Sequence, residues 1–134
     1  MVGKNLAKIL SGALAACLAV LLSASSRAEP APPPIVLRAP HEPPGIVRID
    51  MPERVVSVGQ LVRAAVYTTS NTASVEARIY GYGMPLQRVG VGYFRFAFRI
   101  PEVPFFLKRA WPVQVIARNV DGRRASRRVM IAVQ

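Results

Sequence analysis

The densest group of chemically active side chains is a run of arginines near the C-terminus. Four arginines lie within six residues, and a second basic pair precedes Trp111. The guanidinium group binds phosphate and carboxylate in a bidentate manner. The sequence therefore predicts an anion-binding surface formed by Arg123, Arg124, Arg127, Arg128, Lys108 and Arg109. The alternative interpretation is a solvated basic surface without a particular ligand.

Groups that catalyse reactions are scarce and scattered. His41 is the only histidine, and it lies between Pro40 and Glu42 in a proline-rich stretch, where no nucleophile is held beside it. The seven acids are spread along the chain, whereas glycoside hydrolysis requires two carboxylates at a fixed separation. The glycine-rich residues 81–92 lack the Lys–Ser/Thr step of a phosphate loop. We therefore expect no enzymatic activity and no cofactor.

Metal binding is not expected either, because metal sites require clustered ligands. The methionines at positions 51, 84 and 130 lie in separate segments and are interpreted as apolar residues that fill gaps in the core. A copper carrier that uses these methionines with His41 is the alternative.

The N-terminus predicts export from the cell. Lys4 and Lys8 precede an apolar run over residues 9–22, and Ser26 and Ala28 are the small residues of a cleavage site. This order is typical of a secretory signal peptide over residues 1–28, and the run is shorter than the roughly 20 residues of a spanning helix. We expect a periplasmic or extracellular protein of the bacterial envelope. An uncleaved membrane anchor is one alternative. The other is a lipoprotein acylated at Cys17, because residues 14–17 resemble a lipobox.

Charge and cysteine content follow from that cleavage. Cys17 is the only cysteine, so the mature chain is expected to have no disulfide. Loss of Lys4, Lys8 and Arg27 leaves 15 Lys and Arg against 7 Asp and Glu, a net charge of +8. Such a surface attracts anionic polymers. The expected partners are acidic envelope polymers or another envelope protein. Export argues against nucleic acid, and membrane contact is expected only through the N-terminal segment.

The mature chain divides by composition into a tether and a domain. Residues 29–44 hold seven of the 12 prolines and predict a flexible, polyproline-like tether, although residues 35–37 are also compatible with an edge strand. Residues 45–134 alternate apolar and polar positions in short runs. The predicted strands cover residues 46–50, 61–69, 75–80, 84–89, 93–100, 113–118 and 126–133. About seven short strands at this spacing predict an all-β sandwich of two sheets.

The two-residue period of a strand assigns side chains to faces. On residues 93–100, Phe94, Phe96, Phe98 and Ile100 are predicted to point inward. One outer face is then predicted to carry Arg78, Arg118 and Arg128 with Tyr80, Ile116 and Met130. The other outer face is predicted to carry Arg63, Arg95 and Arg99 with Tyr67 and Tyr93, whose rings are candidates for stacking on sugars.

One motif is more specific than the alternation. Trp111, Val113, Val115, Ala117, Asn119 and Gly122 follow the spacing Tyr-x-Val-x-Val-x-Ala-x-Asn-x-x-Gly. This stretch resembles the last strands of fibronectin type III and bacterial immunoglobulin-like domains. Two positions depart from the pattern. Trp111 cannot make the hydroxyl bond of a tyrosine corner, and Pro112 lacks a backbone donor, so the strand should begin there or lie at an edge.

The resemblance implies an immunoglobulin-like scaffold that serves binding, spacing or adhesion. Together with the charge, it predicts a non-enzymatic exported module that contacts an anionic surface polymer or a partner protein. The alternative function is a periplasmic carrier, or an accessory subunit of an enzyme complex, that contributes no catalytic residue.

Overall fold

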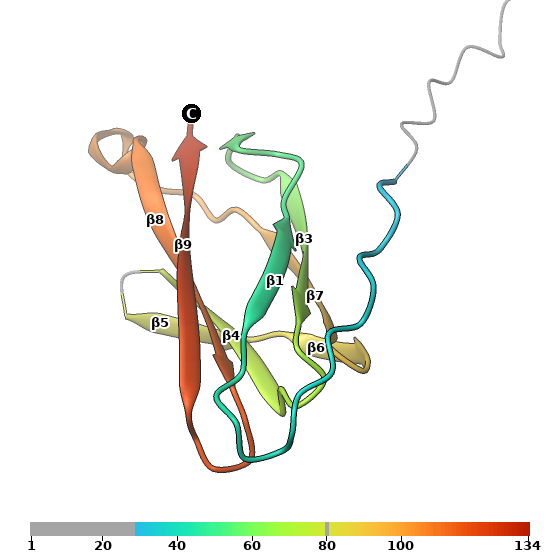
Figure 1. Ribbon diagram of the computed structural model, residues 1–134. Helices are drawn as coiled ribbons and strands as arrows, with labels where there is room; N and C mark the ends of the chain where they lie inside the picture. The colour runs from blue at the N-terminus through green and yellow to red at the C-terminus, as the bar shows by residue number, and fades with distance from the viewer. Residues whose placement is uncertain (1–28, 80) are drawn as a thin grey trace, which may run out of the picture. The chain divides into compact units, whose positions relative to one another are not determined.

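Alternating apolar and polar residues form nine strands in the part of the chain that the computed structural model describes, residues 29–79 and 81–134 (Figure 1). The predicted signal peptide, Cys17 and Tyr80 lie outside these residues. The strands are β1 (Ile46–Asp50), β2 (Val55–Val56), β3 (Leu61–Thr68), β4 (Ser74–Ile79), β5 (Tyr82–Pro85), β6 (Gln87–Gly90), β7 (Tyr93–Arg99), β8 (Ala110–Arg118) and β9 (Arg124–Val133). A short 3₁₀ helix, η1 (Phe105–Leu107), precedes β8.

The strands form two sheets with an immunoglobulin-like order. One sheet has the order β1-β3-β7-β6, and the other has the order β2-β9-β8-β4-β5. If β1, β3, β4, β6, β7, β8 and β9 are lettered A to G, the first sheet reads A-B-E-D and the second contains G-F-C, as in immunoglobulin domains. The predicted all-β, immunoglobulin-like sandwich is therefore confirmed.

Two strands more than the predicted seven are present, because one predicted strand is divided and one was missed. Residues 84–89 were predicted as a single strand. In the structure β5 pairs with β4 in one sheet, whereas β6 pairs with β7 in the other. Between them Leu86 is buried and its N–H donates to the carbonyl of Val75. The buried leucine thus fixes the point where the chain crosses between sheets. The missed strand, β2, has two residues and pairs in parallel with β9.

The core lies between the sheets and consists of the inward residues of both. Val66, Val75, Phe94 and Ala117 are almost fully buried. Phe96 and Phe98 also face this interior but are only half-buried, and they stack on each other with ring centroids 5.9 Å apart. The inward assignment of this strand is thus correct. Met51 packs against the core, whereas Met130 is 51% exposed and fills no gap.

The turn between β6 and β7 requires glycine at position 92. Gly92 has a φ of +62°, and its carbonyl accepts a hydrogen bond from the Thr68 N–H at 2.8 Å. A Cβ at this position would lie 2.5 Å from the Thr68 carbonyl oxygen. Because that oxygen belongs to the backbone of β3, no side-chain movement can relieve the clash.

The segment predicted as a tether contacts the sandwich over much of its length. The carbonyl of Val36 accepts a hydrogen bond from Ser70, and the Asn71 amide donates to the carbonyls of Ala39 and Glu42. Residues 32–134 form one compact unit. Figure 1 shows residues 32–44 descending along the sandwich to the end where the β8–β9 turn lies. It makes no β-ladder, so the edge-strand interpretation of residues 35–37 is wrong.

Asn119 joins the docked segment to the β8–β9 turn. Its side-chain oxygen accepts hydrogen bonds from the N–H groups of Asp121 and Arg123, at 3.0 and 2.9 Å. Its amide nitrogen donates to the carbonyl of Glu42 at 2.9 Å. The side chain is 4% exposed. This one residue therefore shapes the turn and holds the preceding segment against it.

Candidate anion-binding surface

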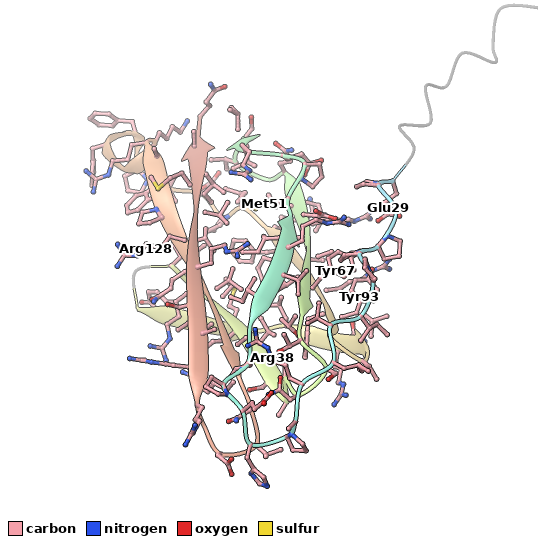
Figure 2. The ribbon with its side chains drawn as sticks, in the orientation of Figure 1. Glu29, Arg38, Met51, Tyr67, Tyr93 and Arg128 are labelled. Carbon is pink, nitrogen blue, oxygen red and sulfur yellow. The ribbon has the colours of Figure 1, made fainter. Side chains whose placement is uncertain are left out.

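The β8–β9 hairpin places the predicted basic residues on three different surfaces. Arg124 lies opposite Arg118 and Arg128 lies opposite Gln114, so both point outward from the five-stranded sheet. Figure 2 shows the Arg128 side chain directed away from the sandwich. Arg123 lies in the turn, and all three are exposed.

Arg127 points to the opposite face of the same strand. It lies one residue from Arg128, so the two-residue period of the strand separates them. Its guanidinium Nη2 donates to the carbonyl of Ile46, at the start of β1, at 2.9 Å. The four clustered arginines therefore do not share one face of the sandwich, and Arg127 has a structural contact that its sequence position did not reveal.

Lys108 and Arg109 lie at the other end of the hairpin. The β8–β9 register runs from Arg118 opposite Arg124 to Ala110 opposite Ala132, which is the full length of the hairpin. The Arg109 guanidinium lies over the Trp111 ring at 4.8 Å from its centroid. These two basic residues are therefore separate from the turn arginines.

The structure brings two further arginines beside Arg124 and Arg128. Arg78 of β4 lies opposite Gln114 of β8, which lies opposite Arg128 of β9. Two outward rows further along, beyond the row of Glu76, Ile116 and Ser126, Ser74, Arg118 and Arg124 are neighbours in the same way. We call the four outward arginines on these three strands the outer basic face; they are Arg78, Arg118, Arg124 and Arg128.

Within the described residues, a single carboxylate lies among these four arginines. Glu76 Oε1 accepts from Arg118 at 2.8 Å and from Arg78 at 2.9 Å. The hydrogen bond from Arg118 is the main cause that lowers the pKa of Glu76 below its ordinary value, and the charge of both arginines adds to it. Within residues 29–79 and 81–134, no carboxylate pairs with Arg124 or Arg128. The outer basic face therefore keeps a positive excess.

Ile116 lies at the centre of this face and yet is 1% exposed. Its neighbours across the ladder are Ser126 and Glu76, and Arg118 follows two residues later. The aliphatic stems of long side chains cover apolar surface while their charged ends stay in water. The burial of an outward isoleucine thus indicates that neighbouring side chains lie over it.

The outer face of the four-stranded sheet has a different chemistry. Tyr67 and Tyr93 stack in parallel, with centroids 4.9 Å apart. Arg48 lies over Tyr67 from the other side, and Arg95 lies over Tyr93 and donates to its hydroxyl. We call this row, Arg48–Tyr67–Tyr93–Arg95, the tyrosine ladder. Burial raises the pKa of Tyr67 above its ordinary value, and the neighbouring Tyr93 raises it further.

The tyrosine ladder leaves little ring face for a ligand. A sugar stacks on the flat face of an aromatic ring, but Tyr67 carries Arg48 on one face and Tyr93 on the other. The second arginine, Arg95, lies over the remaining ring. Tyr67 therefore has no ring face left for a sugar, and sugar stacking on these tyrosines stays a prediction for Tyr93 alone. Arg48 is also paired with Asp50 at 2.7 Å.

The residues of the immunoglobulin-like motif lie in β8 and the turn that follows. Trp111, Val113, Val115, Ala117 and Asn119 are buried, and Gly122 takes a φ of +79° in the turn. The strand begins at Ala110, two residues before Pro112. The pairing of β4 with β8 stops at Gln114, so Pro112 lies beyond the end of the β4 register.

His41 contacts Asp121 between the docked segment and the turn. Its Nδ1 lies 2.7 Å from Asp121 Oδ2, and the two side chains are 80% and 42% exposed. Among the described residues, no three His, Cys, Asp or Glu side chains gather as a metal-binding group would. Nor does any helix within them have the length and apolar character needed to cross a membrane.

Known structures resemble the chain only distantly. No model of a protein family matches it, and no curated protein matches it. A fibronectin(III)-like module of CbhA from Clostridium thermocellum is 12% identical with a TM-score of 0.49, over 64% of this chain and 94% of that module. A superoxide reductase (neelaredoxin) from Ignicoccus hospitalis is 15% identical with a TM-score of 0.45, over 69% and 81%. A Niemann-Pick type C2 protein from the Japanese carpenter ant is 7% identical with a TM-score of 0.46, over 69% and 94%. Similarity at this level says nothing about activity.

Proposed function

We propose that this protein is a non-enzymatic, exported binding module that holds an acidic polymer of the bacterial envelope against its five-stranded sheet. The observation that carries the proposal is the outer basic face, where four arginines lie on three adjacent strands and a single carboxylate pairs with two of them. The signal-peptide pattern of residues 1–28 supports an exported location, in which acidic glycans and lipopolysaccharide are the abundant polyanions.

The spacing of the arginines suits an extended polyanion rather than a small anion. Adjacent strands are about 4.8 Å apart, and residues four apart on one strand, such as Arg124 and Arg128, are about 13 Å apart. No single phosphate or carboxylate reaches all four guanidinium groups over such distances. A polymer with repeating charges reaches them together and gains affinity from each contact.

The balance of charge decides which arginines contribute most. Arg78 and Arg118 already share Glu76, so part of their interaction energy is used within the protein. Arg124 and Arg128 pair with no carboxylate of the described residues, and each offers its whole guanidinium group to a ligand. Hydrogen bonds to charged groups contribute about 1.5–3 kcal/mol each. We therefore expect Arg124 and Arg128 to contribute most of the polymer affinity.

The test compares two double variants that remove the same charge from opposite sheets. Arg124→Ser with Arg128→Ser should lower affinity for heparin and lipopolysaccharide about tenfold or more at moderate salt. Arg63→Ser with Arg88→Ser, on the four-stranded sheet, is the matched control and should lower it only slightly through the change in net charge. Equal losses in both variants would mean that net charge alone attracts the polymer, and the proposed surface would be wrong.

A further inference from the structure

A second candidate contact surface, with two exposed aromatic rings, lies at the end of the sandwich opposite the β8–β9 turn. The side chains of Phe105 and Phe106, in η1, are 83% and 65% exposed. Their rings meet edge to face with centroids 5.7 Å apart. The other three phenylalanines, Phe94, Phe96 and Phe98, all face the interior. Large aromatic residues that are this exposed contribute little to folding, and two of them side by side indicate a contact outside the domain.

The local structure holds these two rings outward. Ile100 is buried before the loop and Trp111 is buried after it, and Val103 packs against the core between them. Pro104 precedes η1 in an extended conformation, with φ −54° and ψ 149°. The turn is closed by the Lys108 N–H, which donates to the carbonyl of Phe105 at 3.2 Å. Both ends of the loop are thus anchored, and the rings form its tip.

Basic side chains surround the base of this tip. Lys108 and Arg109 follow η1 directly and are exposed. The carbonyl of Arg109 accepts from Val133 and the carbonyl of Arg54 accepts from Ala132, so these two arginines flank the end of β9. The acids at this end are Glu53 and Glu102, both exposed. We call Phe105, Phe106, Lys108 and Arg109 the aromatic tip.

We propose that the aromatic tip docks on the surface of an anionic lipid bilayer, with both phenylalanine rings in the interface and Lys108 and Arg109 at the lipid phosphates. Apolar rings beside lysine and arginine are the combination that binds peripheral proteins to anionic membranes. A protein partner fits this surface less well. A stable protein interface covers about 800 Å² on each side, whereas a tip of two rings and one turn is too small for that area.

This proposal goes beyond the polymer-binding function and uses different residues. The sequence alone indicated membrane contact only through the N-terminal segment. The aromatic tip supplies a contact that belongs to the folded domain and is independent of how the N-terminus is processed. It also lies at the other end of the β8–β9 hairpin from the turn and from Arg124.

The experiment places an environment-sensitive dye at the tip and at a control position of equal exposure. Phe106→Cys and Val120→Cys are each made in the full chain with Cys17→Ser; the parent side chains are 65% and 66% exposed. Each protein is mixed with vesicles of phosphatidylglycerol and phosphatidylcholine, and with vesicles of phosphatidylcholine alone. On the anionic vesicles, the dye at position 106 should shift to the blue and be quenched by lipid-borne spin labels, and the dye at position 120 should stay in water. Because the dye reports its own surroundings, anchoring by the N-terminal segment cannot produce this result.

Three results overturn the proposal. The first is a dye at position 106 that stays in water on anionic vesicles, and the second is an equal response at both positions. The third is a blue shift at position 106 that appears without lipid as protein concentration rises, which identifies a second copy of the chain as the occupant. Heparin retention of the same proteins is measured separately, so a failure of this inference is distinguishable from a failure of polymer binding.

The basic residues of the tip are tested with the same dye. Lys108→Ser with Arg109→Ser should raise the amount of anionic lipid required for half of the dye response about 30-fold, because each basic residue at an anionic surface contributes about 1 kcal/mol. Arg124→Ser with Arg128→Ser removes the same charge elsewhere and should change the requirement much less. If the second pair has the larger effect, the outer basic face binds the membrane and the assignment to the tip is wrong.

Discussion

The two outer faces of the sandwich carry similar numbers of arginines but use them differently. On the four-stranded sheet, Arg48 contacts Asp50 and Tyr67, and Arg95 contacts Tyr93. Arg99 donates to the carbonyl of Gly59. On the five-stranded sheet, Arg124 and Arg128 have no such contacts within the described residues, and one glutamate serves the other two arginines. Figure 2 shows Arg128 on one side of the ribbon and the two labelled tyrosines on the other.

This difference shows that basic composition alone does not identify a binding surface. Arginines whose N–H groups are hydrogen-bonded or paired with a carboxylate within the protein stabilise the fold, and that part of their interaction energy is unavailable to a ligand. Exposed arginines without partners repel one another slightly and gain energy only when an anion arrives. The following predictions test this division, from the largest expected effect to the smallest.

The largest effect should come from the interior that separates the two faces. Phe94→Asp places a carboxylate where the parent side chain is 1% exposed, so we expect a loss of more than about 4 kcal/mol, enough to unfold the domain. Arg63→Asp, on the outward side of the adjacent strand, should leave it folded. Thermal unfolding followed by circular dichroism distinguishes the two. A folded Phe94→Asp protein would mean that inside and outside are wrongly assigned.

The tyrosine ladder should matter for stability and not for binding. Tyr67→Ser removes one stacked ring pair and one cation–π contact, which together contribute about 1–3 kcal/mol. Tyr82→Ser, at a tyrosine that is 79% exposed, is the control and should change stability by less than about 0.5 kcal/mol. Urea unfolding measures both variants. A folded Tyr67→Ser protein that had lost retention on an acidic glycan would show that the ladder contacts the polymer after all.

Glu76 should connect stability and binding in opposite directions. Its pKa is lowered in the folded state, so the ionised carboxylate stabilises the protein above the ordinary pKa of 4.5, and this contribution disappears as pH falls through the folded value. Glu76→Gln should therefore be less stable than the parent at pH 7, by about 1 kcal/mol or less, and the gap should close as the pH falls below the ordinary pKa of 4.5 and through the lower folded value.

The same substitution should strengthen polymer binding at pH 7, because Arg78 and Arg118 lose their shared counter-charge. The two measurements are urea unfolding, at pH 7 and in acid, and the salt concentration that elutes the protein from heparin at pH 7. A stability gap that persists in acid, or a lower elution salt, would contradict the role given to Glu76.

The smallest effects separate the clustered arginines from one another. Arg124→Ser with Arg128→Ser should change the free energy of unfolding by no more than about 0.5 kcal/mol, because neither side chain has a partner to lose. Arg127→Ser should cost about 0.5–1.5 kcal/mol, because its bond to the Ile46 carbonyl is lost. Urea titrations measure the free energy of unfolding of both proteins under the same conditions. Equal stability of both proteins would show that the Ile46 contact contributes nothing.

Some features of this protein follow from the sequence because they depend only on neighbouring residues. The period of two along residues 93–100 places Phe94 inside and Arg95 outside whatever the neighbouring strands are. The Asp121–Gly122 step predicts a tight turn, and Gly122 has the positive φ that such turns use. The alternation of apolar and polar residues in successive segments is sufficient to predict the two-sheet architecture and the outward positions of Arg78, Arg118 and Arg128.

Other features depend on residues far apart in the chain, and only the tertiary structure decides them. The split of residues 84–89 between two sheets depends on the burial of Leu86, which local alternation does not reveal. The contact of Arg127 with Ile46 spans 81 residues, and that of Arg118 with Glu76 spans 42. The proline-rich segment is held by Ser70, Asn71 and Asn119. A sequence states which groups are charged, but the neighbours that neutralise them are set by strand pairing across the fold, and that pairing leaves Arg124 and Arg128 available to a ligand.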